Sequence, residues 1–280
     1  MGRAPAGHDT VGQARLREKK HAENFPVALR ILPRDLRRDL GALYDVARVI
    51  DDLGDESAGD RTAALLRFRE DLARVFDDGQ PQEPVLRRLV VTVRARGLDL
   101  EPFDRLVQAN LQDQTVTRYA TQDDLEAYCV LSANPVGRIV LRIFGVRSAE
   151  AERLSDRVCT ALQLLEHCQD VAEDHRAGRI YLPRRDLAAF GVDERDLTGV
   201  RPAVAAQSRR AMELLTEGAP LVRRLHGWAR LAIAGYVAGG LATADALRRA
   251  DWEVLAGPPK PSRRDLFIHM IELLGGRRWA

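Results

Sequence analysis

The chain has 280 residues, of which 45% are hydrophobic and 30% are charged. This composition is typical of a folded globular protein with a sizeable core, and it excludes a disordered chain, a collagen-like chain and a small disulfide scaffold. The 43 Lys and Arg residues nearly balance the 41 Asp and Glu residues, which leaves a net charge of +2 and predicts no nucleic-acid partner.

Apolar residues recur every three or four positions through most of the chain, whereas the alternating pattern of β-strands is missing. In chain order, this spacing predicts helices over residues 36–50, 63–76, 103–111, 125–144, 151–171, 202–218, 221–229 and 231–255. Clusters of Gly, Pro and Asp predict short turns at 54–60, 77–84, 97–102, 191–202 and 257–261. The sequence therefore predicts one all-α domain of about ten helices over residues 21–280, preceded by a flexible segment at 1–20.

Other features bear on the cellular compartment. The three cysteines cannot all pair, and their spacing fits no zinc motif. The N-terminal residues lack an apolar signal core, and the longest uncharged apolar stretch, 231–244, is shorter than the ~18 residues that span a membrane. We therefore expect a cytoplasmic protein. Gly235, Gly239 and Gly240 in the last predicted helix indicate either close helix packing or the wall of a cavity.

The first predicted helix continues into YDVARVIDDLGDE, which holds the first of two acidic clusters. Tyr44, Arg48, Asp51 and Asp55 follow one another at intervals of four, three and four residues, which places them on one helix face. The carboxylates lie at the helix C-terminus, where the macrodipole disfavours negative charge and a bound cation would remove that conflict. Taken alone, such a cluster is more often solvated surface.

A second cluster repeats this pattern in LQLLEHCQDVAEDHRAGRIYLP, where Gln163, Glu166, Asp170 and Asp174 are three, four and four residues apart on one face of another helix. Two facing helices with paired carboxylates predict a site for Mg²⁺ ions, which keep water or phosphate oxygens in their remaining positions and so suit a diphosphate. An EF-hand loop and the paired Glu-x-x-His motif of a di-iron bundle are both missing.

The residues after the second cluster are candidates to clamp a diphosphate. Arg176 and Arg179 supply the charge for that role, although Arg176 is equally explained as a surface residue. Gly178 is expected to end the helix so that Arg179 and Tyr181 turn back over the site. The chain has no P-loop, no GxGxxG motif and no recognisable Ser-His-Asp pattern, which excludes nucleotide-binding and serine-hydrolase functions.

Together with the mid-chain segment YCVLSANPVGRIVLRIFG, the two acidic motifs resemble the squalene and phytoene synthase family over residues 21–266. The three motifs follow the family's order and separation. The resemblance implies an isoprenoid synthase helical bundle with a central active-site cavity, which ionises a prenyl diphosphate with the help of Mg²⁺.

Three shorter segments resemble the bacterial hydroxysqualene synthase branch of that family, namely ENFPVALRILP at 23–33, SANPVG at 132–137 and QDV at 169–171. Gln169 stands where condensing members use an arginine near the diphosphate. The branch implies conversion of presqualene diphosphate and water to hydroxysqualene and diphosphate without NADPH, in bacterial squalene and hopanoid biosynthesis. A presqualene diphosphate synthase would then supply the substrate.

The resemblance also implies roles for individual residues. The implied metal ligands are Asp51, Asp55, Glu166, Asp170 and Asp174. The implied catalytic residues are Tyr44, Arg48, Tyr128 and Arg179. The implied substrate contacts are His21, Asn24, Gln163, Gln169 and Arg176. Core packing explains Tyr128 equally well, and Glu166, where condensing relatives have Asn, either binds metal or orients water.

Two other functions also fit the sequence. One is a condensing synthase that joins two farnesyl or two geranylgeranyl diphosphates on the same scaffold. The other is a non-catalytic lipid-binding or assembly module, which the two intact acidic clusters disfavour. Because the implied product is an oily alcohol, we also expect peripheral contact with the inner membrane.

Overall fold

The structure is a computed structural model that describes residues 32–77 and 80–275. Within these ranges it contains no strand, only an isolated bridge between Arg118 and Ile180. The same ranges contain thirteen helices, which are α3 (Arg34–Asp55), α4 (Arg61–Phe76), α5 (Pro84–Arg96), α6 (Leu100–Asp113), α7 (Gln122–Ser132), α8 (Asn134–Ile143), α9 (Ala149–Gln169), α10 (Val171–Arg176), α11 (Arg184–Ala189), α12 (Arg201–Gly218), α13 (Pro220–Arg224), α14 (Gly227–Arg249) and α15 (Arg263–Gly275). The predicted all-α class is confirmed.

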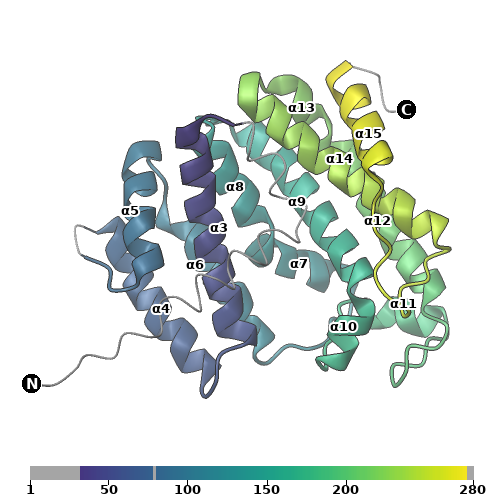
Figure 1. Cartoon of the computed structure of the whole chain (residues 1–280). Coiled ribbons are helices and arrows are strands. Elements are labelled where there is room, and N and C mark those ends of the chain that lie inside the picture. The colour runs from purple at the N-terminus through teal and green to yellow at the C-terminus, as the bar shows by residue number, and fades with distance from the viewer. Residues whose placement is uncertain (1–31, 78–79, 276–280) are drawn as a thin grey trace, which may run out of the picture.

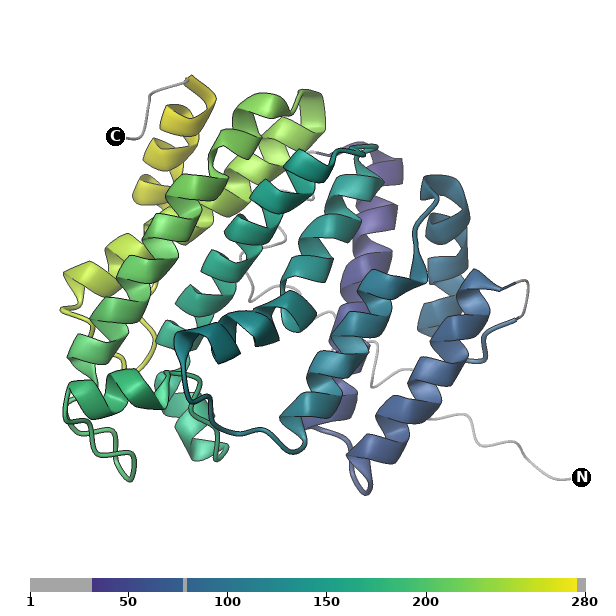
Figure 2. The same ribbon diagram turned by 180° about the vertical axis from the view of Figure 1, so that it is seen from behind.

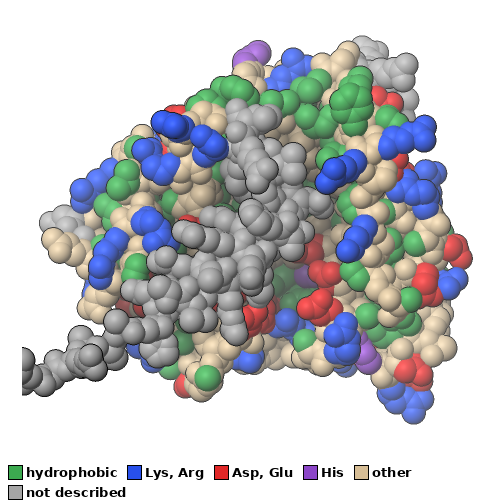
Figure 3. All heavy atoms as spheres, in the orientation of Figure 1, with side chains coloured by type: hydrophobic (Ala, Val, Ile, Leu, Met, Phe, Trp, Pro, Cys, Tyr) green, Lys and Arg blue, Asp and Glu red, His purple; other side chains and the backbone are tan. Residues whose placement is uncertain are grey.

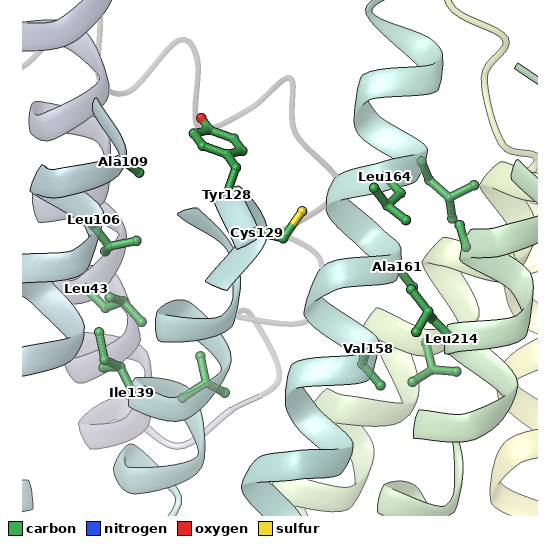
Figure 4. Close-up of a cluster of buried hydrophobic side chains, with 14 of the residues drawn as sticks. Leu43, Leu106, Ala109, Tyr128, Cys129, Ile139, Val158, Ala161, Leu164 and Leu214 are labelled. Atoms are coloured by element: carbon green, nitrogen blue, oxygen red, sulfur yellow. The ribbon is translucent and has the colours of Figure 1, made fainter. Parts of the chain in front are cut away.

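The long helices run side by side. Figures 1 and 2 show α3, α6, α8, α9 and α12 in this arrangement, with α4 and α5 outside α3 and with α14 and α15 at the opposite end. Buried apolar side chains from α3 to α15 form one contiguous cluster. Figure 4 shows part of it, with Leu43 of α3 and Leu106 of α6 on one side and Leu164 of α9 and Leu214 of α12 on the other.

Helix α3 illustrates how the apolar spacing positions acidic side chains. Leu36, Leu40, Leu43 and Ile50 are buried at three- to seven-residue intervals and form one stripe against the core. The helix extends past the predicted end at residue 50 and stops at Asp55, so both carboxylates of the first acidic cluster are helical.

The prediction of one helix over 125–144 is wrong, because this segment forms two helices, α7 and α8. Helix α7 begins in a capping box between Thr121 and Asp124 and ends at Ser132. Pro135 lies in the first turn of α8, where its missing N–H costs nothing, whereas inside a continuous helix it would remove a hydrogen bond. Proline therefore overrides an apolar periodicity that continues across the break.

The prediction that residues 151–171 form one helix carrying the second acidic cluster also needs correction. Helix α9 ends at Gln169, and Asp170 has φ −95° and ψ 10° before α10 begins at Val171. The Asp170 N–H still donates to the Glu166 carbonyl and the Asp174 N–H to the Asp170 carbonyl, each at 2.8–2.9 Å. The helical path therefore continues locally, but its direction changes at Asp170.

The expected helix over 221–229 is also wrong. Helix α13 ends at Arg224, and Leu225 and His226 are extended before α14 begins at Gly227, whose φ is +54°. Helix α14 ends at Arg249, earlier than predicted, because Asp251 and Trp252 adopt positive φ. Helices α5, α11 and α15 are additional to those predicted.

The sequence offered two explanations for the glycines inside α14, close helix packing or the wall of a cavity. A Cβ at Gly240 would lie 2.7 Å from Leu162 Cδ2 and 3.0 Å from Leu215 Cδ1, so this glycine permits close packing against α9 and α12. No described atom lies within 4 Å of a Cβ at Gly235 or Gly239. Close packing therefore explains only Gly240.

Candidate active site

A cavity of about 280 Å³ lies where α3, α6, α7, α9 and α10 approach one another. Its lining includes six carboxylates, which are Asp51, Asp55, Asp113, Glu166, Asp170 and Asp174. Figure 3 shows acidic side chains gathered around a hollow between the ends of α3 and α10. Apolar walls come from Ala47, Leu106, Ala109 and Val136. The cavity thus joins a strongly acidic region to an apolar one.

The cavity brings together most of the residues singled out in the sequence. Those that line it are Asp51, Asp55, Tyr128, Gln163, Glu166, Asp170, Asp174 and Arg179. Four others are not among its lining residues, namely Tyr44, Arg48, Gln169 and Arg176. The remaining two, His21 and Asn24, lie outside the described residues.

Asp51 is positioned by a close approach of α6 to α3. Asn110 Nδ2 donates to Asp51 Oδ1 at 3.2 Å. Gly54 makes room for this contact, because a Cβ there would lie 2.3 Å from Asn110 Oδ1. Although the Asp51 carboxylate is open to the cavity, the surrounding protein desolvates it and raises its pKa to about 6.

The carboxylates on the α9–α10 side also disfavour one another's ionisation. Desolvation, and then the neighbouring charge of Asp170, raise the pKa of Asp174 to about 7. Desolvation, followed by Glu173, raises the pKa of Asp170 as well. Raised carboxyl pKa values on both sides of one cavity indicate negative charge that the described residues do not neutralise.

Arg179 joins the two acidic clusters. Its Nη1 donates to Asp55 Oδ1 at 2.8 Å, across 124 residues of sequence. Gly178, with φ +82°, reverses the chain after α10, and the Arg179 N–H returns to the Asp174 carbonyl at 2.8 Å. The predicted turn that places Arg179 and Tyr181 over the site is confirmed. Burial opposes the Arg179 charge, but the hydrogen bond with Asp55 raises the arginine's pKa overall.

Asp113, at the end of α6, is a cavity residue that sequence reasoning missed. Tyr128 Oη donates to Asp113 Oδ2 at 2.6 Å, and Tyr181 Oη lies 3.5 Å from Oδ1. Desolvation raises the Asp113 pKa to about 6, against the lowering effect of Tyr128. A lone aspartate in LQDQT has no repeated spacing, so no sequence pattern indicates its contact with Tyr128.

His167 was also missed, although it lies inside the second acidic motif. Its ring stacks on Tyr181 with a centroid distance of 3.9 Å and an angle of 11°, and Tyr128 lies tilted at 6.2 Å. Burial, and then the charge of Arg179, lower the pKa of His167 to about 3. Nε2 is buried and has no hydrogen-bond partner within the described ranges.

The predicted residues outside the cavity lining have other surroundings. Arg48 pairs along its own helix, with Nε 3.1 Å from Asp52 Oδ1, and its charge lowers the Asp51 pKa. Gln169 Nε2 donates to the Pro259 carbonyl at 2.7 Å, which ties α9 to the loop after α14. Arg176 is exposed.

The cavity carboxylates can be compared with the ligands that Mg²⁺, the ion implied by the sequence, usually takes. No group of three His, Cys, Asp or Glu side chains among the described residues is arranged to hold a metal ion by itself. However, Mg²⁺ is usually held by one or two carboxylates together with substrate phosphates and water. Six carboxylates against one arginine in the described lining therefore fit Mg²⁺ that arrives with a diphosphate.

Comparison with known proteins identifies relatives of this chain by sequence. The family model for squalene/phytoene synthase matches residues 18–265. The hydroxysqualene synthase of Zymomonas mobilis is 34% identical over 73% of this chain and 71% of its own. The presqualene diphosphate synthase of Rhodopseudomonas palustris is 32% identical over 79% and 74%.

Two solved structures also match this chain. The crystal structure of squalene synthase HpnC from Alicyclobacillus acidocaldarius superposes with a TM-score of 0.78 and 41% identity, over 85% of this chain and 94% of that one. The fold of a dehydrosqualene synthase matches with a TM-score of 0.83 at 24% identity, over 94% and 95%.

Proposed function

The chain belongs to the squalene/phytoene synthase family and is an isoprenoid synthase of the head-to-head type, and we propose that it is a hydroxysqualene synthase. The reaction would convert presqualene diphosphate and water to hydroxysqualene and diphosphate. The observation that carries the proposal is a single cavity in which six carboxylates and Arg179 adjoin apolar walls. The 41% identity with squalene synthase HpnC supports this branch of the family.

The acidic region of the cavity suits the diphosphate of the substrate. Asp51 and Asp55 on α3 share the cavity with Asp170, which caps α10, and with Asp174 inside α10. These four side chains, with Glu166, would hold Mg²⁺. Bound Mg²⁺ withdraws negative charge from a leaving diphosphate. Arg179, fixed by Asp55, adds a positive charge that favours the departing anion.

The other walls suit the hydrocarbon and the cation that forms from it. Leu106, Ala109 and Val136 offer apolar surface to the isoprenoid chains. The rings of Tyr128 and Tyr181 line the same cavity, and aromatic faces stabilise cations. Departure of diphosphate from the cyclopropylcarbinyl carbon, rearrangement and attack by water would then give the alcohol.

A condensing reaction is the second candidate, because a presqualene diphosphate synthase is 32% identical to this chain. The two functions are separated by incubating the purified protein with Mg²⁺ and either presqualene diphosphate or farnesyl diphosphate, with products identified by mass spectrometry. We expect hydroxysqualene from presqualene diphosphate and no consumption of farnesyl diphosphate. Consumption of farnesyl diphosphate would show a condensing synthase, and inactivity on both would contradict the proposal.

We also propose that the protein contacts the inner membrane peripherally and receives its substrate from a presqualene diphosphate synthase. No helix within 32–77 or 80–275 is long and apolar enough to cross a bilayer. On α15, the polar side chains of Asp265 and His269 face α14. Asp265 lies 2.7 Å from Arg249, and His269 lies 2.9 Å from Asp245. Phe267 and Ile271 are 66% and 55% exposed, and the exposed Arg264 shares their face. A basic, apolar helix face of this kind favours an anionic lipid surface.

Vesicle sedimentation tests the membrane contact. We expect the protein to sediment with phosphatidylglycerol vesicles and a Phe267→Ser/Ile271→Ser variant to remain largely in the supernatant. Phe190→Ser is the matched control, because Phe190 is 44% exposed and lies after α11. A double variant that sediments like the unmodified protein would rule out α15 as the contact, and an unmodified protein that stays in solution would rule out the membrane proposal.

A further inference from the structure

His167 lies on the cavity face of α9. Gln163 is four residues before it and Asp170 three residues after it, and both line the cavity with it. Stacking on Tyr181 at 3.9 Å fixes the plane of the imidazole ring. His167 is 6% exposed, so burial and the stack together restrict the ring beside the cavity.

The Nε2 atom of this ring is buried without a hydrogen-bond partner in the described part of the chain. Leaving a polar atom buried without a hydrogen bond costs free energy, which a polar partner that enters the cavity would recover. Ser132 Oγ is a second buried polar atom of the cavity, and it also has no hydrogen-bond partner among the described residues. Ser132 is one helical turn from Tyr128, whose ring contacts His167. Two unsatisfied groups in one cavity can seat a water molecule.

The substrate class limits what can reach these atoms. In the proposed reaction, the polar atoms of the substrate are those of its diphosphate, which the carboxylate-bound Mg²⁺ and Arg179 would retain. The rest of the substrate is hydrocarbon. A water molecule is therefore the polar group left to satisfy His167 and Ser132.

We propose that His167, assisted by Ser132, holds the water molecule that quenches the product cation. This inference rests on the proposed function and deepens it. In the tautomer with the proton on Nδ1, Nε2 has the free lone pair. The water oxygen forms a C–O bond to the product cation while one O–H bond breaks and its proton passes to the released diphosphate or to solvent. The other O–H donates to Nε2 and stays on the alcohol.

The test measures two quantities for presqualene diphosphate with Mg²⁺, namely diphosphate release and the fraction of product that is alcohol. In His167→Phe, which keeps the aromatic stack, we expect diphosphate release to persist while the ratio of alcohol to hydrocarbon falls about tenfold or more. Without an ordered water, the cation loses a proton from carbon and gives a hydrocarbon. His167→Gln retains an acceptor and should keep part of the alcohol, and Ser132→Ala should shift the ratio in the same direction as His167→Phe.

The controls are two residues outside the cavity lining. His175→Gln changes a histidine whose ring bonds the Glu194 carbonyl at 3.1 Å, and Ser155→Ala changes a buried serine of α9. Both should give the unmodified product ratio. An unchanged ratio in His167→Phe, or a parallel fall of diphosphate release and alcohol at constant ratio, would overturn the proposal. If His167→Phe does not fold, the ratio in His167→Gln decides. An unmodified protein that releases no diphosphate would overturn the proposed function itself, and this inference with it.

Discussion

Replacing Asp51 or Asp170 by Asn is expected to reduce turnover by about a thousandfold, which corresponds to about 4 kcal/mol of transition-state free energy. Each substitution removes one carboxylate charge from opposite sides of the cavity while keeping the shape of the side chain. In Asp51→Asn, the amide oxygen of the new side chain can still accept from Asn110, so the local fold is retained. Steady-state kinetics with presqualene diphosphate over a range of Mg²⁺ concentrations provide the measurement.

Thermal unfolding separates lost chemistry from lost structure. Because the pKa of Asp51 is raised to about 6, the protonated carboxyl contributes stability that is fully present below about pH 4 and is lost as the pH rises through about 6. Asn does not ionise, so the metal-free Asp51→Asn variant should be at least as stable as the unmodified protein at pH 8. Glu70→Gln is the matched control, because Glu70 is exposed on α4 and does not line the cavity. Near-normal turnover in Asp51→Asn or Asp170→Asn would remove that residue from the proposed site.

Substituting Gly218 with Ala is expected to destabilise the protein by about 2 kcal/mol and to lower its melting temperature by about 4–8 °C. Gly218 ends α12, and its Cβ would lie 2.7 Å from Val158 Cγ2 and 2.9 Å from the Leu154 carbonyl oxygen of α9. The second contact is with backbone, so it cannot be relieved by a change of rotamer. Differential scanning calorimetry checks the shift.

Gly41→Ala provides the comparison at another helical glycine. No described atom lies within 4 Å of a Cβ at Gly41, which is inside α3. Alanine there should stabilise the helix by about 0.5–1 kcal/mol, because glycine loses more backbone entropy on folding. Equal melting temperatures for the two alanine variants would show that α9 and α12 separate more easily than their packing indicates.

The helices were predictable wherever local spacing decides the structure. The stripe Leu36, Leu40 and Leu43 predicts α3 because helical geometry alone places these residues on one face. The break at Pro135 had a local signal in the proline itself, although the apolar periodicity continues past it. The change of direction at Asp170 has no such signal, because that residue keeps its hydrogen bond to Glu166.

The candidate site was predictable only in part for the same reason. Asp51 and Asp55 could be paired from the sequence, since four residues of helix bring their side chains together. Asp113 was missed, and the contact of Gln169 could not be predicted, because their partners are remote. Asp113 accepts from Tyr128, and Gln169 donates to the carbonyl of Pro259, 90 residues away.

The sequence by itself determined the all-α class, the two acidic helix faces and the turn at Gly178, because each depends on periodicity or backbone preference within a few residues. Only the tertiary structure decided which groups meet. It placed Arg179 on Asp55 across 124 residues and stacked His167 on Tyr181. Such contacts depend on how whole helices pack against one another, and a local spacing pattern does not predict that packing.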